Sequence, residues 1–284
     1  MNFEQALGEP VASAARVGGG CINDGWRVEL ASGRRLFVKT RSEVAPGEYA
    51  AEAEGLRWLA EPGTVRVPSV HAVRDDMLAL EWIDEGSGGL DGSGAEAFGR
   101  GLAELHAAGA KTFGWHEPIR FGPLTIANDP SDDWPAFYAE RRLRPLARQA
   151  AEAGSLSPAA LDAVERVSER ISELAGPPEP PARLHGDLWG GNVLAGADGR
   201  AVLIDPAAHG GHREVDLAML RLFGSPGERF FAAYDKARPL AEGWRERVGL
   251  WQLFPLLVHA VLFGGGYGAS AEREAVRLVG SSRA

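Results

Sequence analysis

The sequence has few residues that would cross-link it or give it a basic surface. It contains one cysteine, Cys21, among 284 residues, so an intrachain disulfide is excluded and a reducing compartment is expected. Its 30 basic residues are outnumbered by 39 acidic ones. The net charge of −9 argues against binding to nucleic acid or an anionic membrane, because both need a basic excess. Only three of the basic residues are lysines, at positions 39, 111 and 236.

Long apolar runs are also missing. No stretch approaches the roughly 18 consecutive apolar residues of a membrane span. The longest apolar segment, 250–263, is interrupted by Gln252, Pro255 and His259 and therefore predicts a buried helix. The first ten residues, MNFEQALGEP, lack the basic region and apolar run of a secretory signal. We therefore expect a cytoplasmic protein that does not bind a membrane.

What is present is typical of an ordinary globular protein. Hydrophobic residues make up 45% of the chain and charged residues 24%. A chain of this length can bury a sizeable core as one large domain or two small ones.

The order of the predicted elements divides the chain in two. Alternating apolar residues predict hairpins within 14–38 and 65–83, and an Ala/Glu/Leu-rich helix is predicted between them at 47–60. The segment 84–94, DEGSGGLDGSG, has the composition of a linker. Beyond it, helices are predicted at 95–108, 131–153, 158–175 and from 214 onward. The sequence thus predicts an α+β, two-lobed fold, with a mainly β lobe at 1–83, a linker at 84–94 and a mainly α lobe at 95–284, and ligands favour such interdomain clefts.

The segment 185–192, HGDLWGGN, has the pattern His-x-Asp-Leu-x-x-x-Asn of a phosphotransfer catalytic loop. In this pattern Asp187 meets the acceptor hydroxyl, and Asn192 turns back to ligate the metal on the phosphates. Gly190 and Gly191 give the backbone the freedom for that turn. The alternative is an ordinary surface turn, since His and Asp beside glycines are common there.

Asp205 follows thirteen residues later, at the end of the apolar run 202–204. A strand that ends in a carboxylate presents it at its tip, where the second metal-binding aspartate of the kinase-like fold lies. Asp-Pro stands here in place of the Asp-Phe-Gly of protein kinases. The alternative is that Asp-Pro only initiates a turn.

The N-terminal half contains the residue types that bind nucleotide phosphates. Gly18, Gly19 and Gly20 join two predicted strands, where backbone N–H groups are able to approach phosphates. The pattern is neither a Walker A loop nor a dinucleotide fingerprint, because no helix follows directly. Lys39 ends a predicted strand and is expected to pair with a glutamate of the next helix. Among the candidates Glu52 is preferred over Glu54, and Glu81, in the strand predicted at 77–83, is also included among the nucleotide-binding residues.

Three further features have structural alternatives. His209 and His212 lie in HGGHREVD and suggest a metal site, but they occupy a glycine-broken turn, so a structural role is preferred. Asp216 is predicted to brace the catalytic loop from a helix start. Trp134 and Trp251 are expected in the core. Trp189 is singled out because it lies between the presumed base and the metal ligand.

Taken together, these motifs resemble the fructosamine kinases (ketosamine-3-kinases), a family of the protein-kinase-like fold near aminoglycoside phosphotransferases and choline kinases. Tryptophan after Asp-Leu separates this family from its relatives. The resemblance spans nearly the whole chain, and the segments that carry it are 18–23, 113–114, 132–135, 142–143, 184–193, 212–219 and 262–265.

The resemblance implies ATP- and Mg²⁺-dependent phosphorylation of the 3-hydroxyl of a ketosamine, free or protein-bound. The phosphate then eliminates, which frees the amine and repairs glycation. By motif, the family implies Asp187 as the base, Asn192 and Asp205 as metal ligands, and Lys39 with Glu52 as the phosphate clamp. Trp189 would line the sugar site.

Two departures from the family pattern bear on the acceptor. The usual Pro-Gln-x-Asn is Thr-Ile-Ala-Asn at 125–128, and the asparagines that often flank the C-terminal histidine are Val258 and Val261 around His259. The sugar or amine preferred here is therefore open. An aminoglycoside- or choline-type phosphotransferase is the alternative within enzymes, although Trp189 argues against it. A catalytically silent nucleotide-binding module is the alternative from another class, but it would be expected to lack Asp187, Asn192 or Asp205.

Cys21 directly follows the three glycines. A thiol over the nucleotide phosphates, near Lys39 and bound Mg²⁺, would favour the thiolate. Oxidation would then give a sulfenic acid or a disulfide-linked dimer and lower activity. The alternative is a buried small side chain in the β lobe.

Overall fold

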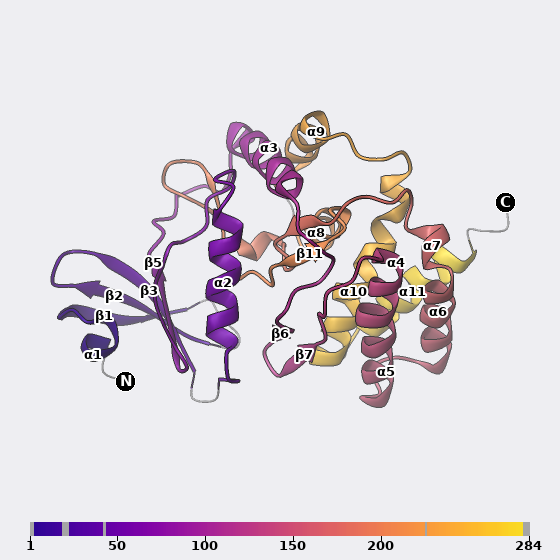
Figure 1. Ribbon diagram of the computed structural model, residues 1–284, viewed down its shortest axis with the longest axis horizontal. Coiled ribbons are helices and arrows are strands. Elements are labelled where there is room, and N and C mark those ends of the chain that lie inside the picture. The colour runs from indigo at the N-terminus through magenta and orange to yellow at the C-terminus, as the bar shows by residue number, and fades with distance from the viewer. Residues whose placement is uncertain (1–2, 19–22, 42–43, 225, 281–284) are drawn as a thin grey trace.

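The computed structural model describes residues 3–18, 23–41, 44–224 and 226–280. The N-terminal region is a five-stranded antiparallel sheet with the order β1-β2-β3-β5-β4, drawn in indigo and violet in Figure 1. Its elements are the short helix α1 (Phe3–Leu7) and the strands β1 (Val11–Val17), β2 (Asp24–Leu30), β3 (Arg35–Thr40), β4 (Val70–Arg74) and β5 (Met77–Glu81). Both predicted hairpin regions are confirmed, because β2 pairs with β3 and β4 with β5.

The two faces of this sheet bury different side chains because successive residues of a strand point to opposite sides. Val28, Leu36 and Val38 lie in a small core on one face. On the other face, Leu78 and Leu80 pack against α2 (Glu48–Ala60). Lys39 lies opposite Leu78 in the β3–β5 register, so it shares the face that α2 covers.

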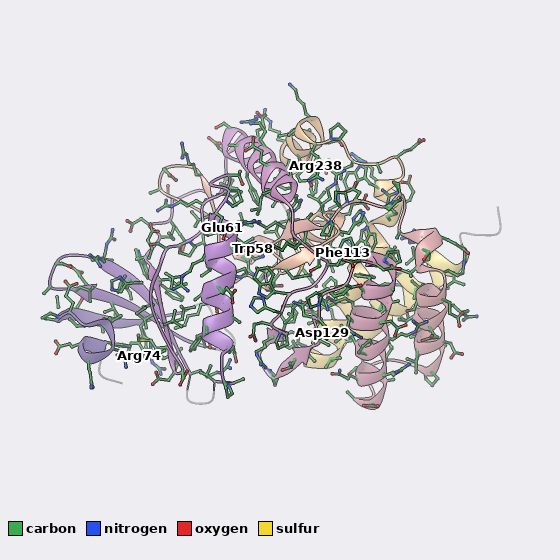
Figure 2. All side chains as sticks on the ribbon, in the orientation of Figure 1. Trp58, Glu61, Arg74, Phe113, Asp129 and Arg238 are labelled. Atoms are coloured by element: carbon green, nitrogen blue, oxygen red, sulfur yellow. The ribbon has the colours of Figure 1, made fainter. Side chains whose placement is uncertain are left out.

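Helix α2 also contacts the helical part of the chain. Arg183, on strand β8 (Ala182–Leu184), places its guanidinium 4.4 Å from the ring centre of Trp58 and donates to Glu61 Oε2 at 2.9 Å. Trp58 and Glu61 are labelled together at the C-terminal end of α2 in Figure 2. These contacts fix α2 between the sheet and the C-terminal helices.

The glycine-rich segment 84–94 is only partly a linker. Helix α3 (Gly92–Ala108) begins three residues before the predicted start at 95, because Asp91 caps it by accepting from the Gly94 N–H at 2.6 Å. The glycine at 94 allows close packing: a Cβ there would lie 2.5 Å from the Gly199 carbonyl oxygen. Composition alone does not distinguish a glycine needed for contact from one needed for flexibility.

The rest of the chain is mainly helical, as predicted, and Figure 1 shows most of these helices on the side away from the sheet. Short two-stranded ladders join β6 to β7, β8 to β11 and β9 to β10. The remaining elements are β6 (Ile119–Phe121), β7 (Leu124–Ile126), α4 (Trp134–Tyr138), the π-helical turn η1 (Ala139–Leu143), α5 (Arg144–Glu152), α6 (Pro158–Glu169), α7 (Ile171–Leu174), the 3₁₀ turn η2 (Gly190–Asn192), β9 (Val193–Ala195), β10 (Ala201–Leu203), β11 (His209–Gly211), α8 (Glu214–Leu222), α9 (Glu228–Ala237), α10 (Trp244–Phe263) and α11 (Tyr267–Gly280).

Helix α10 contains the apolar segment 250–263, and most of this segment is buried as predicted: Leu250, Trp251 and Leu257 have no measurable exposure. Its C-terminal end is not buried, because Phe263 is 61% exposed. Trp134 also lies in the core, at 5% exposure. Within the described ranges, no helix is both long and apolar enough to cross a membrane. The mixed α+β architecture is thus the predicted one, while the predicted lobe boundaries stay predictions.

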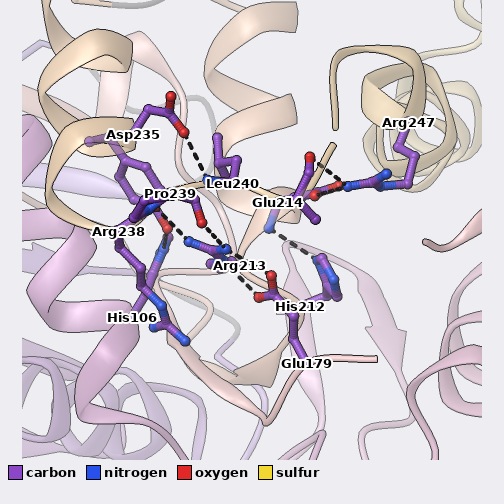
Figure 3. Close-up of polar contacts among 12 residues, drawn as sticks. His106, Glu179, His212, Arg213, Glu214, Asp235, Arg238, Pro239, Leu240 and Arg247 are labelled. Carbon is purple, nitrogen blue, oxygen red and sulfur yellow. Dashed lines mark hydrogen bonds and ion pairs between the residues drawn. The ribbon is translucent and has the colours of Figure 1, made fainter. Parts of the chain in front are cut away.

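A buried ionic network holds α8 against its neighbours (Figure 3). The guanidinium of Arg247 donates to both carboxylate oxygens of Glu214, at 3.0 and 2.6 Å, and the indole of Trp251 donates to the same carboxylate at 2.8 Å. Arg213 donates in the same two-point manner to Glu179. The ring of His212 stacks on Trp251 at 5.1 Å. His212 is 3% exposed, so its burial and this stacking support the structural role preferred from the sequence.

Burial lowers the pKa of four histidines, His106, His185, His209 and His212, the pKa of His209 to about 3. The unfolded chain binds protons at these residues below about pH 6.5, whereas the folded chain excludes them. We therefore expect the free energy of unfolding to be highest above pH 6.5 and to fall below it, by up to about 1.4 kcal/mol per pH unit for each histidine.

Urea unfolding at pH 7.5, 6.5 and 5.5 measures this fall. His209→Gln should remove the binding of about one proton on unfolding and so make the free energy of unfolding less dependent on pH. A free energy of unfolding that does not change between pH 7.5 and 5.5 would contradict the expectation.

Candidate active site

Lys39 is the centre of an ion-pair network between the sheet and the helical part. Its Nζ donates to Glu52 Oε1 at 2.7 Å and to Asp205 Oδ1 at 2.6 Å. The Lys39 side chain is 5% exposed. Burial alone would lower the pKa of Lys39, but the charges of Glu52 and Asp205 outweigh it and raise this pKa, so the lysine is held as a cation. An ammonium ion at this position has the charge needed to bind phosphate oxygens.

The two other glutamates considered from the sequence lie elsewhere. Glu54 points away from Lys39 and pairs with His116 at 3.2 Å, so Glu52 is the residue of α2 that contacts the lysine. Glu81 lies opposite Leu36 in the register, on the sheet face that Lys39 does not share. Its carboxylate accepts from Arg66 at 2.7 Å and from the Ser69 N–H at 3.2 Å. The structure therefore does not bring the Glu81 side chain to the Lys39 group.

Asp187 and Asn192 lie together in the loop that follows β8. The Asn192 side-chain amide donates to the Asp187 carbonyl at 2.8 Å and to its Oδ2 at 3.0 Å. Burial raises the pKa of Asp187 to about 7, and the nearby charges of Asp205 and Asp216 act in the same direction, against the Asn192 hydrogen bond. A raised pKa makes this carboxylate a better proton acceptor than an exposed aspartate.

Asp216, on α8, fixes the backbone of this loop. Its carboxylate accepts from the His185 N–H at 2.8 Å and from the Gly186 N–H at 3.0 Å, which confirms the predicted brace. Gly186 has φ 82°, and a Cβ there would lie 2.1 Å from the Ala207 carbonyl oxygen, so only glycine fits. The His185 imidazole bonds the Ile204 carbonyl at 2.9 Å, which joins the loop to the segment carrying Asp205.

Asp216 is itself held by a further side chain, which the sequence did not reveal. His106 Nε2 lies 3.2 Å from Asp216 Oδ2, and its Nδ1 lies 2.7 Å from the hydroxyl of Tyr234. His106 is a polar residue on the apolar face of α3, four residues after the buried Leu102. A polar residue at an apolar position was the one sign in the sequence that His106 has a buried partner. The partner, Asp216, is 110 residues away in the chain, so the sequence did not identify it.

Asp205 follows β10 and adopts a left-handed backbone, with φ 55°. It is the only non-glycine residue with positive φ among those described, and such a conformation is uncommon outside Gly, Asn and Asp. The turn directs the Asp205 carboxylate, which is 47% exposed, toward Lys39. Backbone strain of this kind concentrates at functional sites.

Asn192 and Asp205 provide donors that suit a magnesium ion. Asn192 uses its amide nitrogen to hold Asp187, which leaves the amide oxygen as the atom available to a cation. The Asp205 carboxylate is exposed enough to meet one. Mg²⁺ at phosphate sites is bound through one or two carboxylates together with phosphate oxygens and water, so this sparse set of protein oxygens fits.

Trp189 precedes the turn that carries Asn192, and its carbonyl accepts from the Asn192 N–H at 2.9 Å. Its indole lies over Gly191, where a Cβ would come 2.2 Å from the ring, and it remains 39% exposed. Gly18 follows β1 and is exposed. Gly19, Gly20 and Cys21 lie outside the described residues, so their predicted contact with phosphates and the predicted oxidation of Cys21 stay predictions.

The second departure noted at the acceptor positions lies in or against the core. Val258 is 4% exposed and belongs to the main hydrophobic cluster of the helical part, and Val261 is partly buried and packs against the same cluster. Asn128 is buried too, and it accepts from Arg142 Nη2 at 2.6 Å.

The arrangement of a buried lysine–glutamate pair, an Asp-x₄-Asn loop and a strand-end aspartate defines the class. The chain is a phosphotransferase of the protein-kinase-like fold with an alcohol group as acceptor. A choline kinase of Streptococcus pneumoniae has the same fold, with a TM-score of 0.65 at 16% identity over 98% of each chain.

The particular family follows from closer similarities. The fructosamine kinase family model matches residues 2–280, and the chain belongs to this family. A solved structure described as a fructosamine-3-kinase of Thermobifida fusca is 47% identical, covers 98% of this chain and 97% of its own, and has a TM-score of 0.92. A probable ketoamine kinase of Synechocystis is 36% identical over 96% of this chain and 93% of its own length. The chloroplastic protein-ribulosamine 3-kinase of Arabidopsis thaliana is 35% identical over 92% of this chain and 81% of its own.

Proposed function

We propose that this protein transfers the γ-phosphoryl group of ATP to the 3-hydroxyl of a ketosamine such as a fructosamine or ribulosamine. The observation that carries the proposal is the Lys39–Glu52–Asp205 network next to the Asp187–Asn192 loop, in a chain of the fructosamine kinase family. The 3-kinase activity named for the Arabidopsis relative supports the position of transfer. A single cysteine and the need for ATP favour the cytoplasm as the compartment.

Each residue has a distinct task in this reaction. Lys39, held as a cation by Glu52, would bind the α- and β-phosphates. Asp187 would accept the proton of the sugar hydroxyl on its carboxylate, and Asn192 keeps that carboxylate oriented. Asn192 and Asp205 would hold Mg²⁺, which when bound supplies positive charge to the phosphate oxygens. Trp189, partly exposed above Gly191, would line the sugar site.

The proposal is tested by measuring ADP release with a panel of acceptors: a fructosamine, a ribulosamine, an aminoglycoside and choline. Turnover is expected only with the two ketosamines, and phosphorus-31 NMR should place the product phosphate on O3. Preferred turnover of the aminoglycoside or of choline would replace the proposed acceptor. ATP binding without turnover of any acceptor would favour the silent nucleotide-binding module.

Glu52 and Glu54 offer a matched pair for testing the phosphate clamp. Glu52→Gln removes the negative charge that fixes Lys39, so the KM for ATP is expected to rise about ten- to hundredfold, the effect of one charged hydrogen bond of roughly 1.5–3 kcal/mol. Glu54→Gln changes the same residue type two positions away on the same helix, where it faces His116, and should leave the KM for ATP unchanged. Equal effects of the two substitutions would contradict the assignment.

A further inference from the structure

Three large hydrophobic side chains are exposed in the described parts of the chain. Trp189 belongs to the catalytic loop, and Phe263, at the end of α10, is 61% exposed. The third, Val276, lies on α11. A single exposed aromatic residue is ordinary, but an exposed apolar patch often marks a binding surface. The question is therefore whether Phe263 belongs to such a patch.

Phe263 is part of a cluster of four aromatic rings. The ring of His259 lies 4.6 Å from Phe223, 4.9 Å from Tyr267 and 5.5 Å from Phe263, measured between centroids. We call these four residues the aromatic shelf. All four keep some exposure, so together they form a surface and not a closed core.

The chain reversal between α10 and α11 brings these rings together. Gly264 and Gly265 have φ values of 62° and 63°, which side chains with a Cβ rarely adopt. The tight turn places both Phe263, before it, and Tyr267, after it, within contact of His259.

The shelf is continuous with the catalytic loop. A Cβ on Gly190, the neighbour of Trp189, would lie 3.3 Å from the Gly224 carbonyl oxygen and 3.4 Å from that of Phe223. The loop backbone therefore rests on the segment that carries Phe223. A substrate whose hydroxyl reaches Asp187 past Trp189 would extend its remaining atoms toward this surface.

The chemistry of the shelf selects for a particular kind of group. His259 donates from Nδ1 to the Pro255 carbonyl at 2.8 Å, and burial lowers the pKa of His259, so the ring is neutral near pH 7. Four uncharged aromatic rings offer apolar contact and faces that attract cations. The amine half of a ketosamine has a group for each of these contacts: a secondary ammonium for the ring faces and an organic substituent for the apolar surface.

We propose that the aromatic shelf of Phe223, His259, Phe263 and Tyr267 binds the amine half of the ketosamine and selects substrates with aromatic or long apolar amine substituents. This assignment rests on the proposed function, since it names the acceptor class for the same site. Phe263 is its most exposed member and the residue that a substituent meets most directly.

The test compares two fructosamines that differ only in the amine substituent, 1-benzylamino- and 1-methylamino-1-deoxyfructose, at saturating ATP. The protein should prefer the benzyl compound. Phe263→Ala should lower the ratio of the two kcat/KM values about tenfold, mainly through a higher KM for the benzyl compound. Phe263→Leu keeps an apolar side chain of similar size, so it should lower this ratio less than Phe263→Ala does. Because Phe263 is 61% exposed, truncation opens no core cavity, and an unchanged thermal midpoint checks that the fold is intact.

Val276→Ala is the matched control, because it truncates an exposed apolar residue of α11 that is not part of the shelf and should leave the ratio unaltered. A ratio that Phe263→Ala does not change, or that Val276→Ala changes equally, would overturn the shelf's role while the kinase activity stands. If the unaltered protein releases ADP with neither compound, the proposed function fails, and the shelf's assignment fails with it.

Discussion

Replacing Asp187 by asparagine is expected to slow phosphoryl transfer by roughly 10²–10⁴, the usual contribution of a positioned proton acceptor. The asparagine side chain is nearly isosteric and its oxygen is still able to accept from the Asn192 amide, so the loop should keep its shape. ATP affinity should change little, because Asp187 is proposed to face the acceptor and the predicted phosphate ligands are other residues. Single-turnover kinetics and calorimetric titration with ATP measure the two quantities separately.

Asp198→Asn provides the control for that substitution. Asp198 lies in the turn between β9 and β10, is 48% exposed, and accepts from the Arg200 N–H at 3.1 Å. The same chemical change at this surface carboxylate should leave kcat within about twofold, as expected away from the reacting atoms. A large loss of ATP binding in Asp187→Asn with kcat preserved would contradict the assignment of Asp187 as the base.

Asp205→Asn is expected to lower the rate of phosphoryl transfer by roughly 10³-fold or more. The reason is that charge stabilisation by a bound metal contributes several kcal/mol to this reaction. Lys39 keeps Glu52 as a partner, so weak ATP binding through the lysine should persist. The activity that remains should need a higher Mg²⁺ concentration than that of the unaltered protein.

A magnesium titration of both proteins separates the metal role of Asp205 from its ion pair with Lys39. A metal ligand predicts a shifted Mg²⁺ dependence, whereas loss of the ion pair alone predicts a higher KM for ATP at an unchanged Mg²⁺ dependence. Turnover within a few-fold of the unaltered protein would remove Asp205 from its assigned role.

The sequence by itself determined those parts of the site that depend on local pattern. Strand alternation placed Lys39 on a strand, and Glu52 was preferred over Glu54 because it lies one helical turn before the apolar Leu56. The His-x-Asp-Leu-x-x-x-Asn spacing placed Asp187 and Asn192 in one loop, and an apolar run ending in a carboxylate marked Asp205. These features are set by interactions between residues close in the chain, so one sequence is enough to predict them.

Only the tertiary structure decided which groups meet across long separations. Lys39 and Asp205 pair over 166 residues, and His106 supports Asp216 over 110. Register between β3 and β5 turned Glu81 to the opposite face from Lys39, a result that composition does not encode. The glycines of 84–94 were placed as linker residues by composition, but Gly94 lies inside α3, which Asp91 caps. A glycine is needed there because the Gly199 carbonyl of the β9–β10 turn approaches it. The aromatic shelf joins His259 and Phe263 of α10 and Tyr267 of α11, which are close in the chain, to Phe223 after α8. Only tertiary packing brings Phe223 to His259.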